Sequence, residues 1–157
     1  MGFKFSLEKV LRARQITVDL AQKDFNEAMS FYNQQESLRD QMIELKKENE
    51  ASRSVIVSSE DQWSSQVLQI NEFLHGQDYR IAQQNKRLSE IDKLVQNRRE
   101  ILLKALTEAK MIEKIKEKKM KEFVSENIKK EQKEIDEIIA AKGNKMNDFN
   151  KPKIKGE

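Results

Sequence analysis

Residues 67–112 read VLQINEFLHGQDYRIAQQNKRLSEIDKLVQNRREILLKALTEAKMI, and this stretch decides the fold. Within it, apolar and a few polar residues recur at alternating gaps of three and four, which is the heptad spacing of a coiled coil. The series runs through Val67, Ile70, Leu74, Gln77, Ile81, Gln84, Leu88, Ile91, Val95, Arg98, Leu102, Ala105, Ala109 and Ile112. A helix with such a seam needs a second helix to cover it.

The seam contains three polar residues, Gln77, Gln84 and Arg98. A polar residue buried in a coiled-coil seam lowers stability but fixes register and orientation. The alternative is that these side chains lie at a solvated rim, where they would specify nothing. The sequence leaves both interpretations open.

A partner helix precedes this stretch. A heptad series starts at Leu7, and Leu38, Met42 and Leu45 continue it after a shift of phase, which indicates an irregular coiled coil. Its first members are Leu7, Leu11, Val18, Ala21, Phe25, Ala28 and Tyr32. We therefore expect a first helix over about residues 6–51.

Between the two series, residues 52–61 combine serines with three consecutive β-branched residues, which are weak helix formers, so a turn is expected there. Ser59 with Gln62, or Ser58 with Asp61, has the spacing of a capping box for a second helix over about residues 62–142. Gly143 reads as the stop of that helix, and residues 143–157 as a flexible basic tail.

The predicted fold is all-α, a long antiparallel two-helix coiled-coil hairpin that forms one domain over residues 1–157. A turn centred near residue 57 would set Leu7 opposite Ala105 to Ala109 and Met42 opposite Asn71 to Leu74. The second helix then overhangs the first from about Lys110 to Lys142. An isolated helix is marginal in water, so this overhang should fray, oligomerise or be completed by another protein.

Composition argues against an enzyme, because 36% of residues are charged and only 6% are aromatic, too polar for a large core. The chain has no cysteine, and its single histidine, His75, lies outside the seam. No phosphate-binding loop, catalytic triad or metal-ligand spacing occurs in the sequence. We expect no catalytic residue, no cofactor and no metal.

The net charge of +3 is spread among many opposite charges. Nine lysines and five glutamates between Lys110 and Lys133 give a local net charge of +4, which is a solvated face or a surface for an acidic protein. The interspersed glutamates would repel phosphates, so no nucleic-acid partner is expected. The sequence also shows no secretory signal and no membrane-spanning segment, which predicts a soluble protein.

Apolar residues outside the seam indicate partner surfaces. Ile43, Trp63, Phe73 and Tyr79 approach the predicted hairpin tip, where they would either contact a partner or close the tip itself. Between residues 94 and 115 the helix is apolar over a wider arc than a two-stranded seam needs. The residues of that arc are Leu94, Ile101, Leu103, Leu106 and Ile115.

Three segments together resemble the FliJ family of flagellar export proteins. They are FKFSLEKVLRAR at residues 3–14, NEFLHGQDYRI at residues 71–81, and EKIKEKK at residues 113–119 followed by KEQKEIDE at residues 130–137. Each is weak alone, but their order and their distance from the hairpin make the resemblance fairly specific, and it covers nearly the whole chain.

The resemblance implies a non-enzymatic stalk, like the rotor of a rotary ATPase, that binds the ring of the flagellar type III export ATPase, the cytoplasmic linker of the export gate, and export chaperones. The stalk would be cytoplasmic and peripheral to the inner membrane through these protein partners. The implied gate contacts are Leu38, Met42, Leu45, Phe73, Gln77 and Tyr79. The implied ring contacts, at the end where the termini pair, are Leu7, Arg12, Arg14, Ile101, Leu103, Lys118 and Lys119.

The first helix has one tyrosine, Tyr32, and it precedes the gate face, which carries Leu45 and Glu48 instead. This departure from the family puts an aromatic gate contact from that helix in doubt. Three other interpretations stay open: a self-associating scaffold unrelated to flagella, the related stalk of an injectisome and, ranked last, a basic helical nucleic-acid binder.

Overall fold

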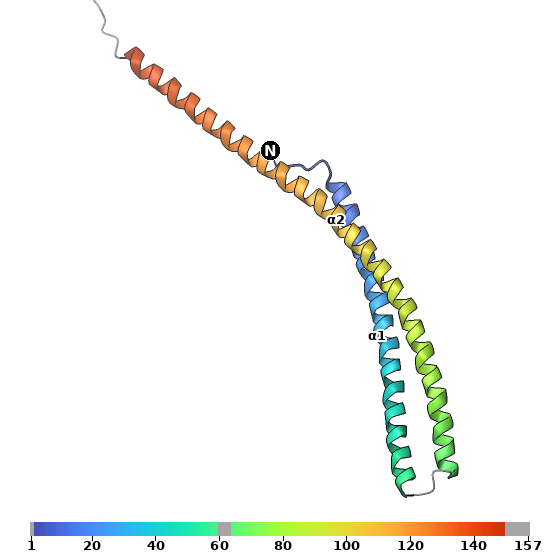
Figure 1. Ribbon diagram of the computed structural model, residues 1–157. Coiled ribbons are helices and arrows are strands. Elements are labelled where there is room, and N and C mark those ends of the chain that lie inside the picture. The colour runs from blue at the N-terminus through green and yellow to red at the C-terminus, as the bar shows by residue number, and fades with distance from the viewer. Residues whose placement is uncertain (1, 60–63, 150–157) are drawn as a thin grey trace, which may run out of the picture. The chain divides into compact units, whose positions relative to one another are not determined.

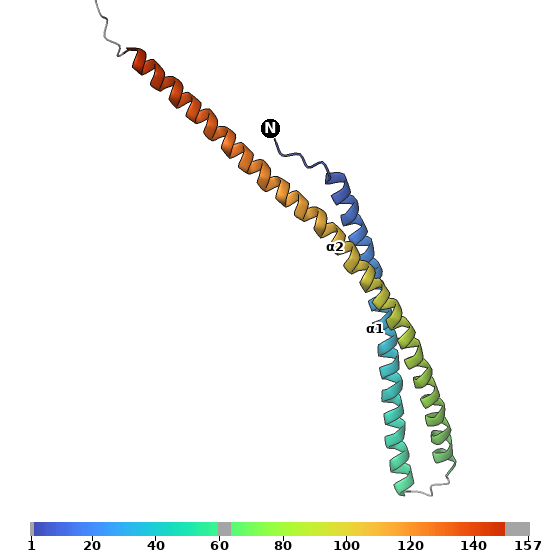
Figure 2. The same cartoon turned by 45° about the horizontal axis from the view of Figure 1, so that its top comes forward.

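The computed structural model describes residues 2–59 and 64–149, with side chains for residues 2–59 and 64–143. These ranges contain two helices, α1 (Glu8–Ser59) and α2 (Ser65–Phe149), and no strand. Within residues 13–109 the helices run antiparallel and side by side in both views (Figures 1 and 2). The predicted all-α helical hairpin is therefore confirmed.

The chain divides into two compact units. One unit, residues 13–109, contains the hairpin, and the other combines residues 1–12 with residues 110–157. Both helices contribute residues to both units.

Alanines let α1 and α2 approach closely in the hairpin unit, and larger side chains cover them. Ala21 packs with Leu102 and Ala105, and Val18 and Phe25 close over this cluster. Farther along, the buried residues Ala28, Ile91 and Val95 form a second cluster, which Phe25, Met29 and Tyr32 cover. All the buried residues of both clusters belong to the predicted seams.

Helix α1 ends later than predicted, because residues 52–59 continue the helix to Ser59 instead of forming a turn. The hydroxyls of Ser52 and Ser54 donate to the carbonyls of Glu48 and Glu50 at 3.0 Å, and that of Ser59 donates to Val55 at 3.0 Å. Serine competes with the backbone for hydrogen bonds, but here each hydroxyl bonds a carbonyl one turn earlier within the helix. The predicted turn over residues 52–61 rested on the turn-forming tendency of serine and on the three β-branched residues.

Helix α2 begins at Ser65, and Ser64 is its N-cap residue. The Ser64 hydroxyl accepts a hydrogen bond from the Val67 amide at 3.4 Å, as N-cap serines do. The predicted capping serines, Ser58 and Ser59, lie inside α1. Their predicted partners Asp61 and Gln62, the predicted helix start at residue 62, and Trp63 lie outside the described residues.

The predicted stop at Gly143 is also wrong, since α2 continues to Phe149. Gly143 does not adopt the positive φ that a left-handed helix cap requires. Residues 150–157 of the predicted tail lie outside the described residues.

The pairing register of the two helices also differs from the prediction, because α1 ends later than predicted. The residue numbers of cross-helix partners add up to 119 for Gln77 with Met42 and for Gln84 with Gln35, and to 122 for Arg98 with Asp24. The predicted value was 114, from a turn centred near residue 57. Because α1 is longer, Met42 lies opposite Gln77 rather than Asn71 to Leu74.

Candidate partner-binding surfaces

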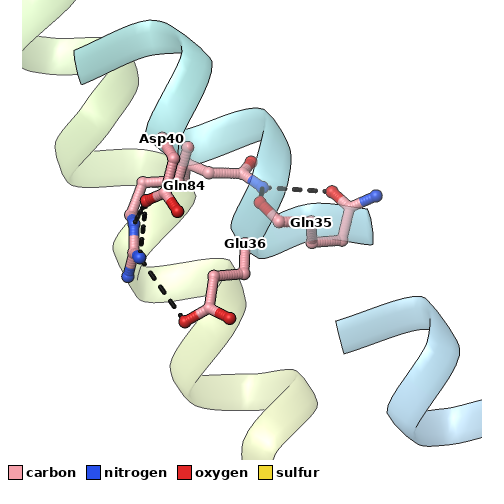
Figure 3. Close-up of polar contacts among 5 residues, drawn as sticks. Gln35, Glu36, Asp40 and Gln84 are labelled. Carbon is pink, nitrogen blue, oxygen red and sulfur yellow. Dashed lines mark hydrogen bonds and ion pairs between the residues drawn. The ribbon is translucent and has the colours of Figure 1, made fainter. Parts of the chain in front are cut away.

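Two buried glutamines link α1 to α2. Gln77 is 2% exposed and Gln84 is 7% exposed. The Gln77 side-chain amide donates to the Met42 carbonyl at 3.0 Å. That of Gln84 donates to the Gln35 carbonyl at 2.9 Å and to Gln35 Oε1 at 3.1 Å (Figure 3). Both glutamines lie inside the seam, and the rim interpretation is wrong for them.

Cross-helix ion pairs flank the hairpin seam. Arg98 lies at its edge with Nη1 3.4 Å from Asp24 Oδ2, and Arg14 pairs with Glu108. Near the other end, Lys46 Nζ lies 2.7 Å from Asp78 Oδ1, and this hydrogen bond raises the pKa of Lys46. Partly exposed pairs of this kind contribute little stability, but they oppose wrong registers.

A second polar group lies on α1 beside Gln84. Arg39 Nη2 is 2.7 Å from Asp40 Oδ1 and 3.5 Å from Glu36 Oε1 (Figure 3). The hydrogen bond to Asp40, with the charge of Glu36, raises the pKa of Arg39. The guanidinium stays charged at any physiological pH.

The candidate gate residues all lie in the hairpin unit, but they differ in access. Tyr79 is 67% exposed, whereas Leu38 and Leu45 are 40% and 44% exposed. Met42 and Phe73 are half-buried, and Gln77 is buried in the seam. A partner on this face would therefore meet Tyr79 and the edges of Phe73 and Met42, with Gln77 positioning α1 beneath them.

A shallow groove of about 560 Å³ lies beside Tyr79. Met42 contributes one wall from α1, and the remaining lining comes from α2: Tyr79, Arg80, Gln83, Gln84, Lys86, Arg87 and Glu90. Three cations against one carboxylate make this groove basic. The groove was not predicted from the sequence, because Arg80 lies six residues before Lys86 and Arg87 and only the hairpin brings Met42 against these cations.

The candidate ring residues divide between the two units. Arg14, Ile101 and Leu103 belong to the hairpin unit, where Ile101 and Leu103 are 44% and 53% exposed. The other four candidates belong to the second unit, where Leu7 is half-buried and the rest are exposed; they are Leu7, Arg12, Lys118 and Lys119.

In the second unit, the N-terminal segment packs against α2 through a group that we name the N-terminal clasp: Phe3, Phe5, Glu8, Lys116 and Phe123. The Phe3 ring centroid lies 5.6 Å from that of Phe123 and 6.5 Å from that of Phe5. Lys116 Nζ lies 5.9 Å from the Phe5 centroid and 2.7 Å from Glu8 Oε2. The hydrogen bond from Lys116 holds the pKa of Glu8 below its ordinary value.

The clasp corrects the predicted overhang, because residues 110–123 of α2 have an intramolecular partner. The sequence did contain a signal for it, since Phe123 continues the α2 seam in phase and two aromatic residues precede α1. The prediction failed because the predicted register set Leu7 opposite Ala105 to Ala109. In that register no part of α1 lies opposite residues 110–123, and the N-terminal segment has no predicted contact with α2.

Beyond the clasp, one face of α2 carries what we name the C-terminal apolar stripe. It consists of large side chains that are 44–63% exposed, namely Met120, Val124, Ile128, Ile135, Ile138 and Ile139. Met120, Val124 and Ile128 line a mostly apolar groove of about 430 Å³, with lysines 121 and 129 at its edges. Adjacent residues point about 100° apart around a helix, so Val124 faces away from Phe123 and the clasp.

Over the described residues, no group of three or more acidic or histidine side chains could hold a metal ion. In the same part of the chain, neither helix is apolar over enough of its length to cross a bilayer.

The family model described as flagellar FliJ protein matches residues 3–145. No curated protein matches the chain. No solved structure matches it either.

Proposed function

This chain belongs to the flagellar FliJ family, and from that membership we propose that it is the stalk that couples the export ATPase to the export gate. Membership of this family implies that the chain is a component of the flagellar protein export apparatus. The FliJ family consists of structural components rather than of enzymes. We propose that the stalk binds and stimulates the ATPase ring, contacts the cytoplasmic linker of the gate and receives export chaperones. It would act at the cytoplasmic face of the inner membrane through these partners.

The observation that carries this proposal is the family match over residues 3–145 on a chain that folds as a helical hairpin. Two antiparallel helices that are linked through the buried side chains of Gln77 and Gln84 suit a part that transmits contact from one partner to another. The hairpin leaves Tyr79 exposed on one surface and Ile101 and Leu103 on another, which gives it more than one surface for partners.

The ring contact predicts that Ile101→Asp lowers stimulation of ATP hydrolysis roughly tenfold or more, as loss of an apolar interface contact does. Ile101 is 44% exposed, so helicity should stay unchanged. Reversing Lys118 and Lys119 to glutamate should lower stimulation too. The difference from the unchanged chain should shrink as salt rises, because salt screens exposed charges. ATPase rate against stalk concentration at two salt concentrations measures both effects.

A matched control for the charge reversal is Lys93→Glu with Arg99→Glu, which changes the same number of exposed cations on α2. The control for Ile101→Asp is Asn97→Asp, because it adds the same carboxylate at another exposed position of α2. Full stimulation by both ring variants would move the ring contact to another surface.

The gate contact predicts that Phe73→Ala weakens binding to the gate linker by about 1 to 3 kcal/mol, as for an aromatic anchor. Phe73 is half-buried at the surface, so the melting temperature and ATPase stimulation should remain near those of the unchanged chain. Gate affinity, melting temperature and ATPase stimulation should be measured on the same preparation.

Phe31→Ala is the matched control, because Phe31 is an exposed aromatic on α1 outside the candidate gate face. If Phe73 instead closes the fold, its loss lowers the melting temperature and weakens both partner activities together. That outcome would remove Phe73 from the gate interface.

A further inference from the structure

We propose that two copies of this chain associate through the C-terminal apolar stripe, as an antiparallel pair of α2 helices. This inference does not rest on the proposed function, since it uses only residues 118–141 of the second unit. The side chains of the stripe are 44–63% exposed, and the clasp leaves them uncovered.

The spacing of the stripe is that of a second coiled-coil seam. Positions 121, 124, 128, 131, 135 and 138 follow one another at gaps of three, four, three, four and three. Apolar residues occupy four of these six positions, Val124, Ile128, Ile135 and Ile138, and Met120 and Ile139 flank them. Each of these side chains is 44–63% exposed, so no other part of the described residues covers this apolar face of α2.

The same spacing is symmetric about its centre. If two copies pair antiparallel with residue numbers adding up to 259, Val124 of one copy faces Ile135 of the other, and Ile128 faces Glu131. Each contact then occurs twice, as a two-fold symmetric interface requires. This spacing allows a second copy to pair with the stripe, and the charges of the two halves of the stripe favour that occupant over another protein.

Charge supports the same orientation. Residues 118–129 contain four lysines and two glutamates, net +2, whereas residues 130–141 contain two lysines, three glutamates and one aspartate, net −2. Antiparallel pairing sets the basic half of one copy against the acidic half of the other. Parallel pairing would place like halves together, which is unfavourable.

The interface is short, and Lys121 and Glu131 occupy seam positions, so the dimer should be weak and dependent on concentration. Sedimentation of the full chain should show the mass rise from 18.5 kDa toward twice that value as concentration increases. Replacing Ile128 and Ile135 with alanine should weaken the dimer roughly tenfold or more while keeping the helix, since alanine is the best helix former. Glu122→Ala with Lys133→Ala, on the opposite face, should leave dimerisation unchanged.

Disulfide crosslinking tests the orientation, because the chain has no cysteine of its own. Val124→Cys mixed with Ile135→Cys should give the mixed disulfide in excess over either homodimer. Glu122→Cys mixed with Lys133→Cys should crosslink at background level. Homodimers of Val124→Cys in excess would indicate parallel pairing and overturn the proposal.

A constant mass at all concentrations would also overturn it. If the alanine variant keeps that constant mass but fails to stimulate the export ATPase, the stripe is covered by the ring rather than by a second copy. The failure of the dimer is then distinguishable from a failure of the proposed stalk function, because ATPase stimulation and mass are measured separately.

Discussion

Replacing Ile91 with aspartate should cost the hairpin roughly 3 kcal/mol or more of unfolding free energy, because it buries a charge in an apolar cluster. Ile91 is 7% exposed and packs with Ala28 and Val95. Chemical denaturation followed by helical circular dichroism measures the loss.

The control is Asn97→Asp, which introduces the same carboxylate on an exposed part of α2 and should change stability by less than about 0.5 kcal/mol. Equal losses in the two variants would mean that Ile91 does not lie in the seam, and the hairpin register would be wrong.

Replacing Phe5 with alanine should open the N-terminal clasp. Phe5 is 9% exposed, stacks on Phe3 and lies beneath Lys116, so its loss removes both the burial and the cation contact. Loss of about 2 kcal/mol from this packing corresponds to about a 30-fold rise in local opening. Tryptic cleavage after Lys4 and hydrogen exchange at the Leu11 amide, which donates to Leu7, should both accelerate.

Val10→Ala removes an exposed side chain from the same part of α1 and should leave cleavage and exchange unchanged. The hairpin unit should keep its melting transition in both variants, because none of its described packing involves Phe5. Unchanged cleavage in the Phe5 variant would show that the clasp does not hold the N-terminal segment.

The sequence predicted which side chains face the partner helix, and it was less successful on where the helices end. The seam residues from Val67 to Ala109 emerge from periodicity alone, since a helix repeats its geometry at every turn. The end of α1 depends on a competition between turn-forming and helical hydrogen bonds, and in the structure the hydroxyls of Ser52 and Ser54 bond carbonyls within the helix. The predicted pairing register depended on where α1 ends. The error in that one helix end therefore placed Met42 opposite Asn71 to Leu74 instead of Gln77.

The partner surfaces, too, could be predicted from the sequence only in part. The exposure of Tyr79 and Ile101 followed from their positions off the seam. The groove beside Tyr79 and the clasp needed residues distant in sequence to meet, and those contacts depend on the correct register. Phe3 and Phe123 are 120 residues apart, and no short spacing signals their contact.

The two buried glutamines have different consequences for motion along the helix axes. Backbone carbonyls recur at every residue of α1, so a slide of one heptad, about 10 Å, would offer Gln77 an equivalent acceptor. The bond from Gln84 to the side chain of Gln35 has no such copy and would break, as would the pairs of Asp24 and Asp78. The glutamine-to-carbonyl bonds thus oppose separation of the helices, while the side-chain pairs also oppose sliding of one helix along the other.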